Sequence, residues 1–149
     1  MPSAAPRSLR LAAAALCALA LVATGCGGGS SYKEDLDKAN NEFNTAFRKS
    51  NSKIRTGKTE KDYREGFTEA KSAIQTLEGK LRTFKPPARA RAAQARLLTA
   101  LDTLSRDLDA LLQSISSSNI EKLRTVLTKY LQDLQALQVA GGRLKKLAG

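Results

Sequence analysis

The chain has 149 residues, of which 42% are hydrophobic and only 5% aromatic, a composition that favours one helical domain with a hydrophobic core. It contains no histidine, which excludes Ser-His-Asp and Cys-His catalysis and most zinc, copper and haem sites. Its 25 lysines and arginines against 14 acids give a formal net charge of +11. That balance indicates an anionic partner, or charge that serves only solubility.

The first 25 residues have the pattern of a signal peptide. Arg7 and Arg10 precede an unbroken apolar run from Leu11 to Val22, and small residues follow. This run is shorter than the roughly 20 residues that a membrane-spanning helix needs, so a permanent transmembrane helix is not expected.

The sequence Ala23-Thr24-Gly25-Cys26 resembles the lipobox of bacterial lipoproteins. The resemblance implies that a peptidase recognises Ala23, Thr24 and Gly25 and cuts before Cys26, whose sulfur carries a diacylglyceryl group. It also implies a protein anchored by lipid to the extracytoplasmic face of the cell membrane or the outer membrane. Ala23 departs from the leucine or valine that is more common there. The alternative is a secreted protein in which Cys26 has no role.

The mature chain is predicted to start with a short tether over 26–31, where the sequence GGGSS is flexible. The first helix is predicted over 32–55, with Ser31 and Glu34 forming a capping box. Its apolar stripe is thin and consists of Tyr32, Leu36, Ala39, Phe43, Ala46 or Phe47, and Ile54.

Three further helices are predicted over 59–84, 87–116 and 119–147, with Thr59 and Ser118 as caps of the first and last. Their apolar residues recur at alternating spacings of three and four: Tyr63, Phe67, Ala70, Ile74, Leu77, Leu81 and Phe84; Leu97, Leu101, Leu104, Leu108, Leu111 and Ile115; Leu123, Leu127, Tyr130, Leu134 and Leu137, widened by Val126 and Leu131, with Leu144 beyond. Gly141-Gly142 interrupts the last stripe. We expect a helix break near Ala140, or else a close backbone contact at the glycines.

A seven-residue repeat with short connections is typical of helices that pack at shallow angles with their sequence neighbours. The sequence therefore predicts an all-α fold over 32–149, an antiparallel up-down-up-down four-helix bundle that follows a cleaved signal peptide. A monomer is expected. A homodimer that shares its core is the alternative, because the first stripe is thin.

No catalytic site, metal site or cofactor is expected. The acids of the second and third helices fall at positions read as exposed, where they pair with nearby cations: Glu65, Glu69, Glu78, Asp102, Asp107 and Asp109. No phosphate-binding glycine loop or di-iron motif is present in the sequence. Nucleic acid is not expected as a partner, because the chain is exported and its basic runs lack interleaved aromatic residues.

The predicted topology sorts the basic residues between the two ends of the bundle. Eight are expected at the membrane-proximal end, as contacts to anionic lipid: Lys80, Arg82, Lys85, Arg89, Arg91, Arg143, Lys145 and Lys146. The opposite end would face an acidic envelope polymer or an acidic protein through Arg48, Lys49, Lys53, Arg55, Lys58 and Lys61. The predicted function is an interaction or structural role in the cell envelope. The alternative is a small apolar or anionic ligand bound in a groove beside Ala39, Phe43 and Ala46.

Overall fold

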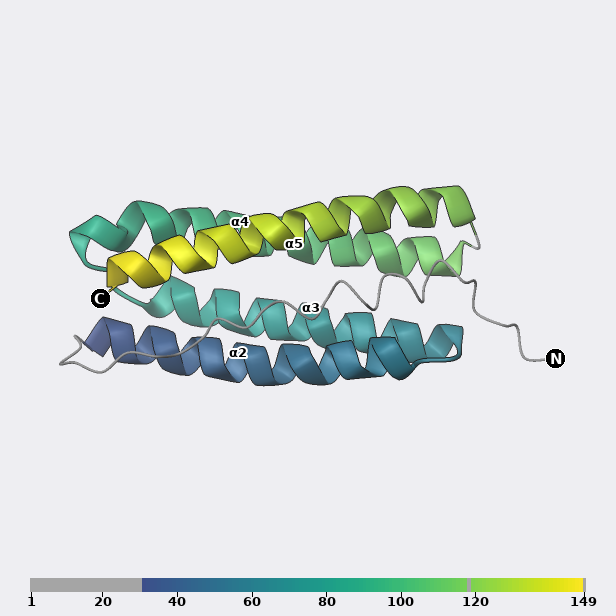
Figure 1. The fold of residues 1–149 in the computed structure, drawn as a ribbon, viewed down its shortest axis with the longest axis horizontal. Helices are drawn as coiled ribbons and strands as arrows, with labels where there is room; N and C mark the ends of the chain where they lie inside the picture. Colours follow the sequence, from purple (N-terminus) through teal and green to yellow (C-terminus); the bar gives the residue numbers. More distant parts are fainter. Residues whose placement is uncertain (1–30, 118, 149) are drawn as a thin grey trace.

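The computed structural model describes residues 31–117 and 119–148, and within them the chain forms four α-helices (Figure 1). They are α2 (Ser31–Thr56), α3 (Glu60–Thr83), α4 (Arg91–Ser116) and α5 (Ile120–Ala148), and a 3₁₀ turn, η2 (Ala88–Ala90), precedes α4. These residues contain no β-strand, so the predicted all-α bundle is confirmed. The predicted leader (1–25), the tether residues 26–30 and Ser118 lie outside the described residues.

The four helices lie side by side and form a rod with two distinct ends (Figure 1). At one end the Tyr32 ring meets Phe84 edge-on, with centroids 6.4 Å apart, and the Tyr32 hydroxyl donates to Gln94 Oε1 at 2.8 Å. Arg89 Nε also donates to the Leu147 carbonyl there, at 3.0 Å. We call this end, formed by residues 31–38, 78–96 and 140–148, the Tyr32 end. The opposite end, formed by 46–65, 112–117 and 119–126, is the Gly57 end.

The predicted apolar stripes form one contiguous core. α3 packs against both α2 and α4, and α4 packs against α5, whereas α2 and α5 touch only sparsely. Because the buried apolar side chains of all four helices belong to this single core, the described residues contain the hydrophobic core that a domain needs to fold. In α4 every predicted core residue is buried: Leu97, Leu101, Leu104, Leu108, Leu111 and Ile115. In α5 the residues Val126, Leu127 and Leu131 lie at the margin of the core and are half-buried.

The stripe of α2 is thin because polar residues occupy part of it. Phe47 is buried and Ala46 is exposed, which settles the choice between these two positions. Ser50 and Asn51 are buried between Phe47 and Ile54, so the Gly57 end of α2 contributes little apolar surface there.

The contact between α2 and α3 is closest at Gly66. A Cβ atom added to Gly66 would lie 2.5 Å from Ile54 Cγ1, 3.3 Å from the Ile54 backbone nitrogen and 3.4 Å from the Ser50 carbonyl oxygen. Ile54 is fully buried. Glycine therefore allows the two helix backbones to approach to a distance at which any larger residue would clash with Ile54.

The helix ends follow the capping chemistry of their sequences, with some differences from prediction. Thr59 caps α3 as predicted: its hydroxyl accepts from Asp62 N at 3.2 Å, and the Asp62 carboxylate accepts from Thr59 N at 3.0 Å. At the start of α5, the Asn119 side chain accepts a hydrogen bond from Lys122 N at 2.9 Å, where Ser118 was the predicted cap. Ser31 is the first residue of α2 and not a preceding cap.

Two predicted boundaries in the second half of the chain are wrong. The helix predicted from residue 87 begins as α4 only at Arg91, because Pro87 leads into the 3₁₀ turn. The predicted break near Ala140 does not occur, since α5 continues through Gly141 and Gly142 to Ala148. Gly141 is buried, and Leu144 and Ala148 beyond it extend the core. Burial of these side chains offsets the low helix propensity of the two glycines.

Candidate functional surfaces

The predicted lipidation site, Cys26, and the cleavage residues Ala23, Thr24 and Gly25 lie outside the described residues. The nearest described position is Ser31, five residues after Cys26 in the sequence, where α2 begins at the Tyr32 end. Among the helices of the described chain, none combines the length and apolarity that crossing a bilayer requires.

All eight basic residues predicted for one end of the bundle belong to segments of the Tyr32 end. Four of them interact within the protein, and Lys145 is one of these. Lys80 pairs with Glu42, Arg82 with Glu78, and Arg89 donates to the Leu147 carbonyl. Four others are exposed, and no ion pair joins them to the described acids: Lys85, Arg91, Arg143 and Lys146. Lys145 is half-buried.

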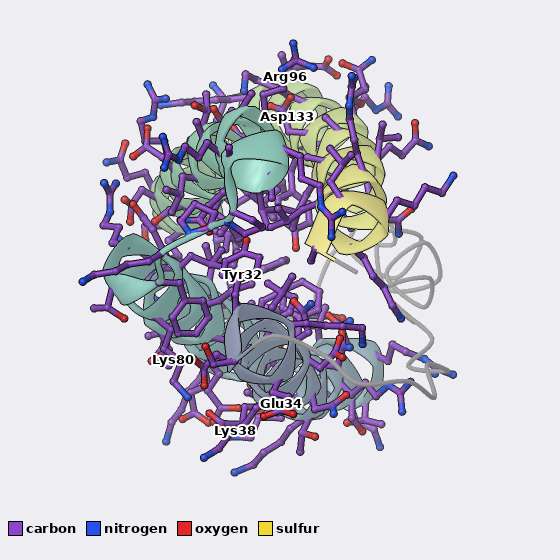
Figure 2. The ribbon with its side chains drawn as sticks, turned by 90° about the vertical axis from the view of Figure 1, so that its left-hand side faces the viewer. Tyr32, Glu34, Lys38, Lys80, Arg96 and Asp133 are labelled. Atoms are coloured by element: carbon purple, nitrogen blue, oxygen red, sulfur yellow. The ribbon has the colours of Figure 1, made fainter. Side chains whose placement is uncertain are left out.

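The Tyr32 end also carries acidic residues, so its charge must be counted as a whole. Viewed from this end, Tyr32 points inward among the helices, whereas Glu34 and Lys38 lie on the outside of α2 (Figure 2). The Tyr32 end has 11 lysines and arginines against four acids, and the Gly57 end has nine against four. The middle of the rod has three against six. Both ends are therefore positive and the middle is negative.

Asp107 corrects the sequence analysis, which placed it at an exposed position. It is only 5% exposed and lies between α4 and α5. Lys129 Nζ donates to Asp107 Oδ1 and to Asp133 Oδ2, both at 2.6 Å. Burial raises the pKa of Asp107, whereas the hydrogen bond from Lys129 lowers the pKa of Asp133. One ammonium thus holds two carboxylates in different environments, and the cluster ties α4 to α5.

Two buried polar atoms near this cluster have no hydrogen-bond partner in the described part of the chain: Asp107 Oδ2 and the Tyr130 hydroxyl. Tyr130 is fully buried, and its ring meets Phe67 of α3 edge-on with centroids 6.4 Å apart. Burial, with the charge of Asp107, raises the pKa of Tyr130, so its hydroxyl stays protonated. An unpaired buried hydroxyl costs stability, so this part of the core is locally unfavourable.

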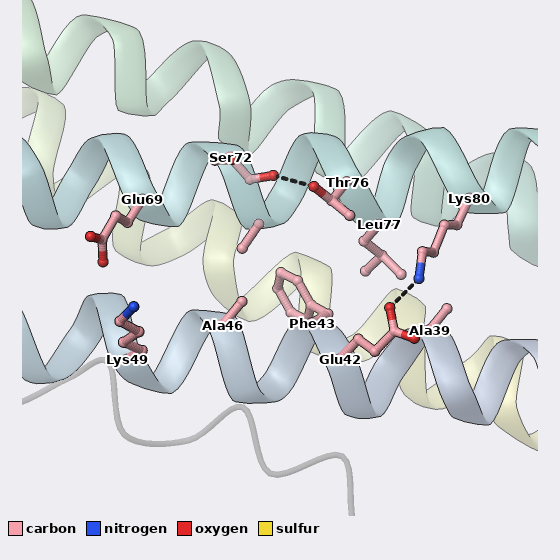
Figure 3. A pocket seen from close by; sticks show the side chains of 11 residues that line it. Ala39, Glu42, Phe43, Ala46, Lys49, Glu69, Ser72, Thr76, Leu77 and Lys80 are labelled. Atoms are coloured by element: carbon pink, nitrogen blue, oxygen red, sulfur yellow. Dashed lines mark hydrogen bonds and ion pairs between the residues drawn. The ribbon is translucent and has the colours of Figure 1, made fainter.

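A groove runs along the outside of the bundle between α2 and α3 (Figure 3). It encloses about 420 Å³ and includes the three residues beside which a ligand groove was predicted, Ala39, Phe43 and Ala46. Sequence reasoning missed its α3 wall. The feature of the sequence that could have located this wall is the row of small residues Ser72, Ala73 and Thr76, which lies opposite the alanines of α2. The full lining is Ala39, Glu42, Phe43, Ala46, Lys49, Glu69, Ser72, Ala73, Thr76, Leu77 and Lys80.

Two ion pairs join the walls of the groove. Lys80 of α3 donates to Glu42 of α2 near the Tyr32 end, and Lys53 of α2 donates to Glu69 of α3 toward the Gly57 end. The hydrogen bond from Lys80 lowers the pKa of Glu42, and the bond to Glu69 raises the pKa of Lys53. Each of the two acids thus has a lysine partner on the opposite wall.

Comparison with known protein families, with curated proteins and with solved structures finds no match for this chain.

Proposed function

We propose that the protein is a bacterial envelope lipoprotein, anchored through Cys26, whose helical body has an interaction or structural role at the membrane surface. The observation that carries the proposal is the position of Ser31. It begins α2 at the positively charged Tyr32 end, five residues after Cys26. A tether of this length reaches at most about 17 Å, so a lipid on Cys26 would hold that end beside the bilayer.

The charge of the Tyr32 end supports contact with anionic head groups. Near such a surface each lysine or arginine contributes up to about 1 kcal/mol, and the effect decays within a Debye length. Of the eight predicted residues, those suited to this contact are the exposed ones without a described ion pair, namely Lys85, Arg91, Arg143 and Lys146. Lys80, Arg82 and Arg89 are less suited, because they are engaged inside the protein.

Mass spectrometry of the chain exported by a bacterium tests the anchor. The mature protein is expected to begin at Cys26 and to carry the mass of a diacylglyceryl group. The Cys26→Ser variant is expected to keep its leader and to lack the acyl mass. A mature chain that begins elsewhere, or a Cys26 without acyl mass, would contradict the proposal.

A vesicle assay tests the orientation separately, with residues 27–149 prepared without lipid. We expect binding to vesicles that contain phosphatidylglycerol and little binding to neutral phosphatidylcholine vesicles. Neutralising Lys85, Arg91, Arg143 and Lys146 to glutamine should weaken binding at least tenfold at low salt.

The matched control removes four exposed cations from the Gly57 end, through Arg48→Gln, Lys58→Gln, Lys122→Gln and Arg124→Gln. It changes the net charge by the same amount and should weaken binding much less. Equal losses in the two quadruple variants would show that net charge, not the Tyr32 end, drives binding.

A further inference from the structure

We propose that the groove between α2 and α3 binds a single-chain anionic amphiphile, with its carboxylate at Lys49 and its alkyl chain along Phe43 toward Ala39. The inference goes beyond the proposed lipid anchor and does not depend on it, because every residue involved lies in the helical body.

The shape of the groove suits one extended alkyl chain. Its α2 wall runs from Ala39 to Lys49, ten residues or about 15 Å along the helix axis. The floor is formed by Phe43 and Leu77, and the small side chains of Ala46 and Ala73 leave room above it. The volume of about 420 Å³ falls at the low end of the range for small-molecule sites.

The charges of the groove select an anion over a cation. Of the four charged residues that line it, Glu42 is neutralised by Lys80, and Glu69 is neutralised by Lys53. Lys49 remains, and no ion pair joins it to the acids of the described chain. Figure 3 shows its ammonium group directed across the groove toward the Glu69 side chain of α3, whose own ion pair is with Lys53. A cationic amphiphile would meet no uncompensated acid there.

Dodecanoate is the probe, titrated calorimetrically into residues 27–149 below its micelle-forming concentration. Dodecanol and dodecyltrimethylammonium are titrated in parallel. We expect one dodecanoate per chain, weaker binding of dodecanol and the weakest binding of the ammonium compound. Comparable binding of all three compounds would overturn the proposal, because it would show apolar partitioning without an anion site.

Two variants locate the site. Ala46→Trp fills the groove from an exposed position, replaces no buried side chain and should abolish dodecanoate binding. Ala95→Trp places the same side chain at an exposed position of α4 and should leave binding unchanged. Lys49→Gln should weaken dodecanoate about fivefold, but not dodecanol, whereas Lys122→Gln should affect neither.

Equal effects of the two tryptophan variants would place the ligand elsewhere and overturn the inference. A dimer induced by dodecanoate, detected by analytical ultracentrifugation, would also overturn the inference, because the groove would then be an interface between two copies of the chain. Circular dichroism of each variant confirms that a loss of binding is not a loss of fold. The lipid state of Cys26 does not enter this experiment, so its outcome is independent of the anchor test.

Discussion

Replacing Gly66 with alanine tests the close packing of α2 against α3. The new Cβ would lie 2.5 Å from Ile54 Cγ1, and the backbone atoms behind that side chain leave little room for it to retreat. Overpacking of a filled core typically costs about 1–3 kcal/mol, and the backbone contacts favour the upper half of that range. Alanine regains about 1 kcal/mol through helix propensity. We therefore expect Gly66→Ala to lower the free energy of unfolding by about 1–2 kcal/mol.

Urea denaturation followed by circular dichroism measures this change, and a thermal scan should show a Tm lower by about 4–8 °C. Gly79→Ala is the matched control, because it lies in the same helix with nothing within 4 Å of the added Cβ. It should stabilise the protein by up to about 1 kcal/mol. If Gly66→Ala were as stable as Gly79→Ala, the close approach of α2 and α3 would be refuted.

Three further substitutions probe other contacts, each by urea denaturation. Thr59→Ala removes the capping box of α3 and should cost about 1 kcal/mol, whereas Thr68→Ala, on the exposed face of the same helix, should not destabilise. Tyr32→Phe removes the hydroxyl that donates to buried Gln94 and should cost about 1 kcal/mol; no loss would mean that this bond adds nothing. Asp107→Asn removes a carboxylate whose pKa is raised by burial, so the folded state of the wild type loses stability as the pH rises above 3.8 and Asp107 ionises. The variant should gain stability relative to wild type from pH 3.8 to neutral pH, and a pH-independent difference would contradict this assignment.

The helices were predictable because the seven-residue repeat leaves few alternatives. Each leucine from Leu97 to Leu111 in the α4 stripe is buried, as its spacing requires. The cap at Thr59 was likewise predictable from local chemistry. These features depend on residues a few positions apart, which a single sequence shows directly.

The remaining features depend on contacts between helices. Asp107 was read as exposed from its charge, although it lies three residues after Leu104 and four before Leu111, on the buried face. Gly66 gave no signal, because its role lies in the distance to Ile54 on another helix. For the groove, the sequence indicated only the α2 side, since the thin stripe of Ala39 and Ala46 does not reveal which residues of α3 lie opposite.

The positive ends and negative middle of the rod have a consequence for how copies would crowd together. Under the proposed anchor on Cys26, all copies would be attached at the same plane of the bilayer, so each positive end would lie beside the positive end of its neighbour. If one rod moved along its axis by half its length relative to its neighbour, a positive end would lie beside a negative middle. Attachment of both rods to the same plane of the bilayer would oppose that movement. Repulsion at separations near the Debye length, about 8 Å at physiological salt, would keep the molecules dispersed across the membrane surface.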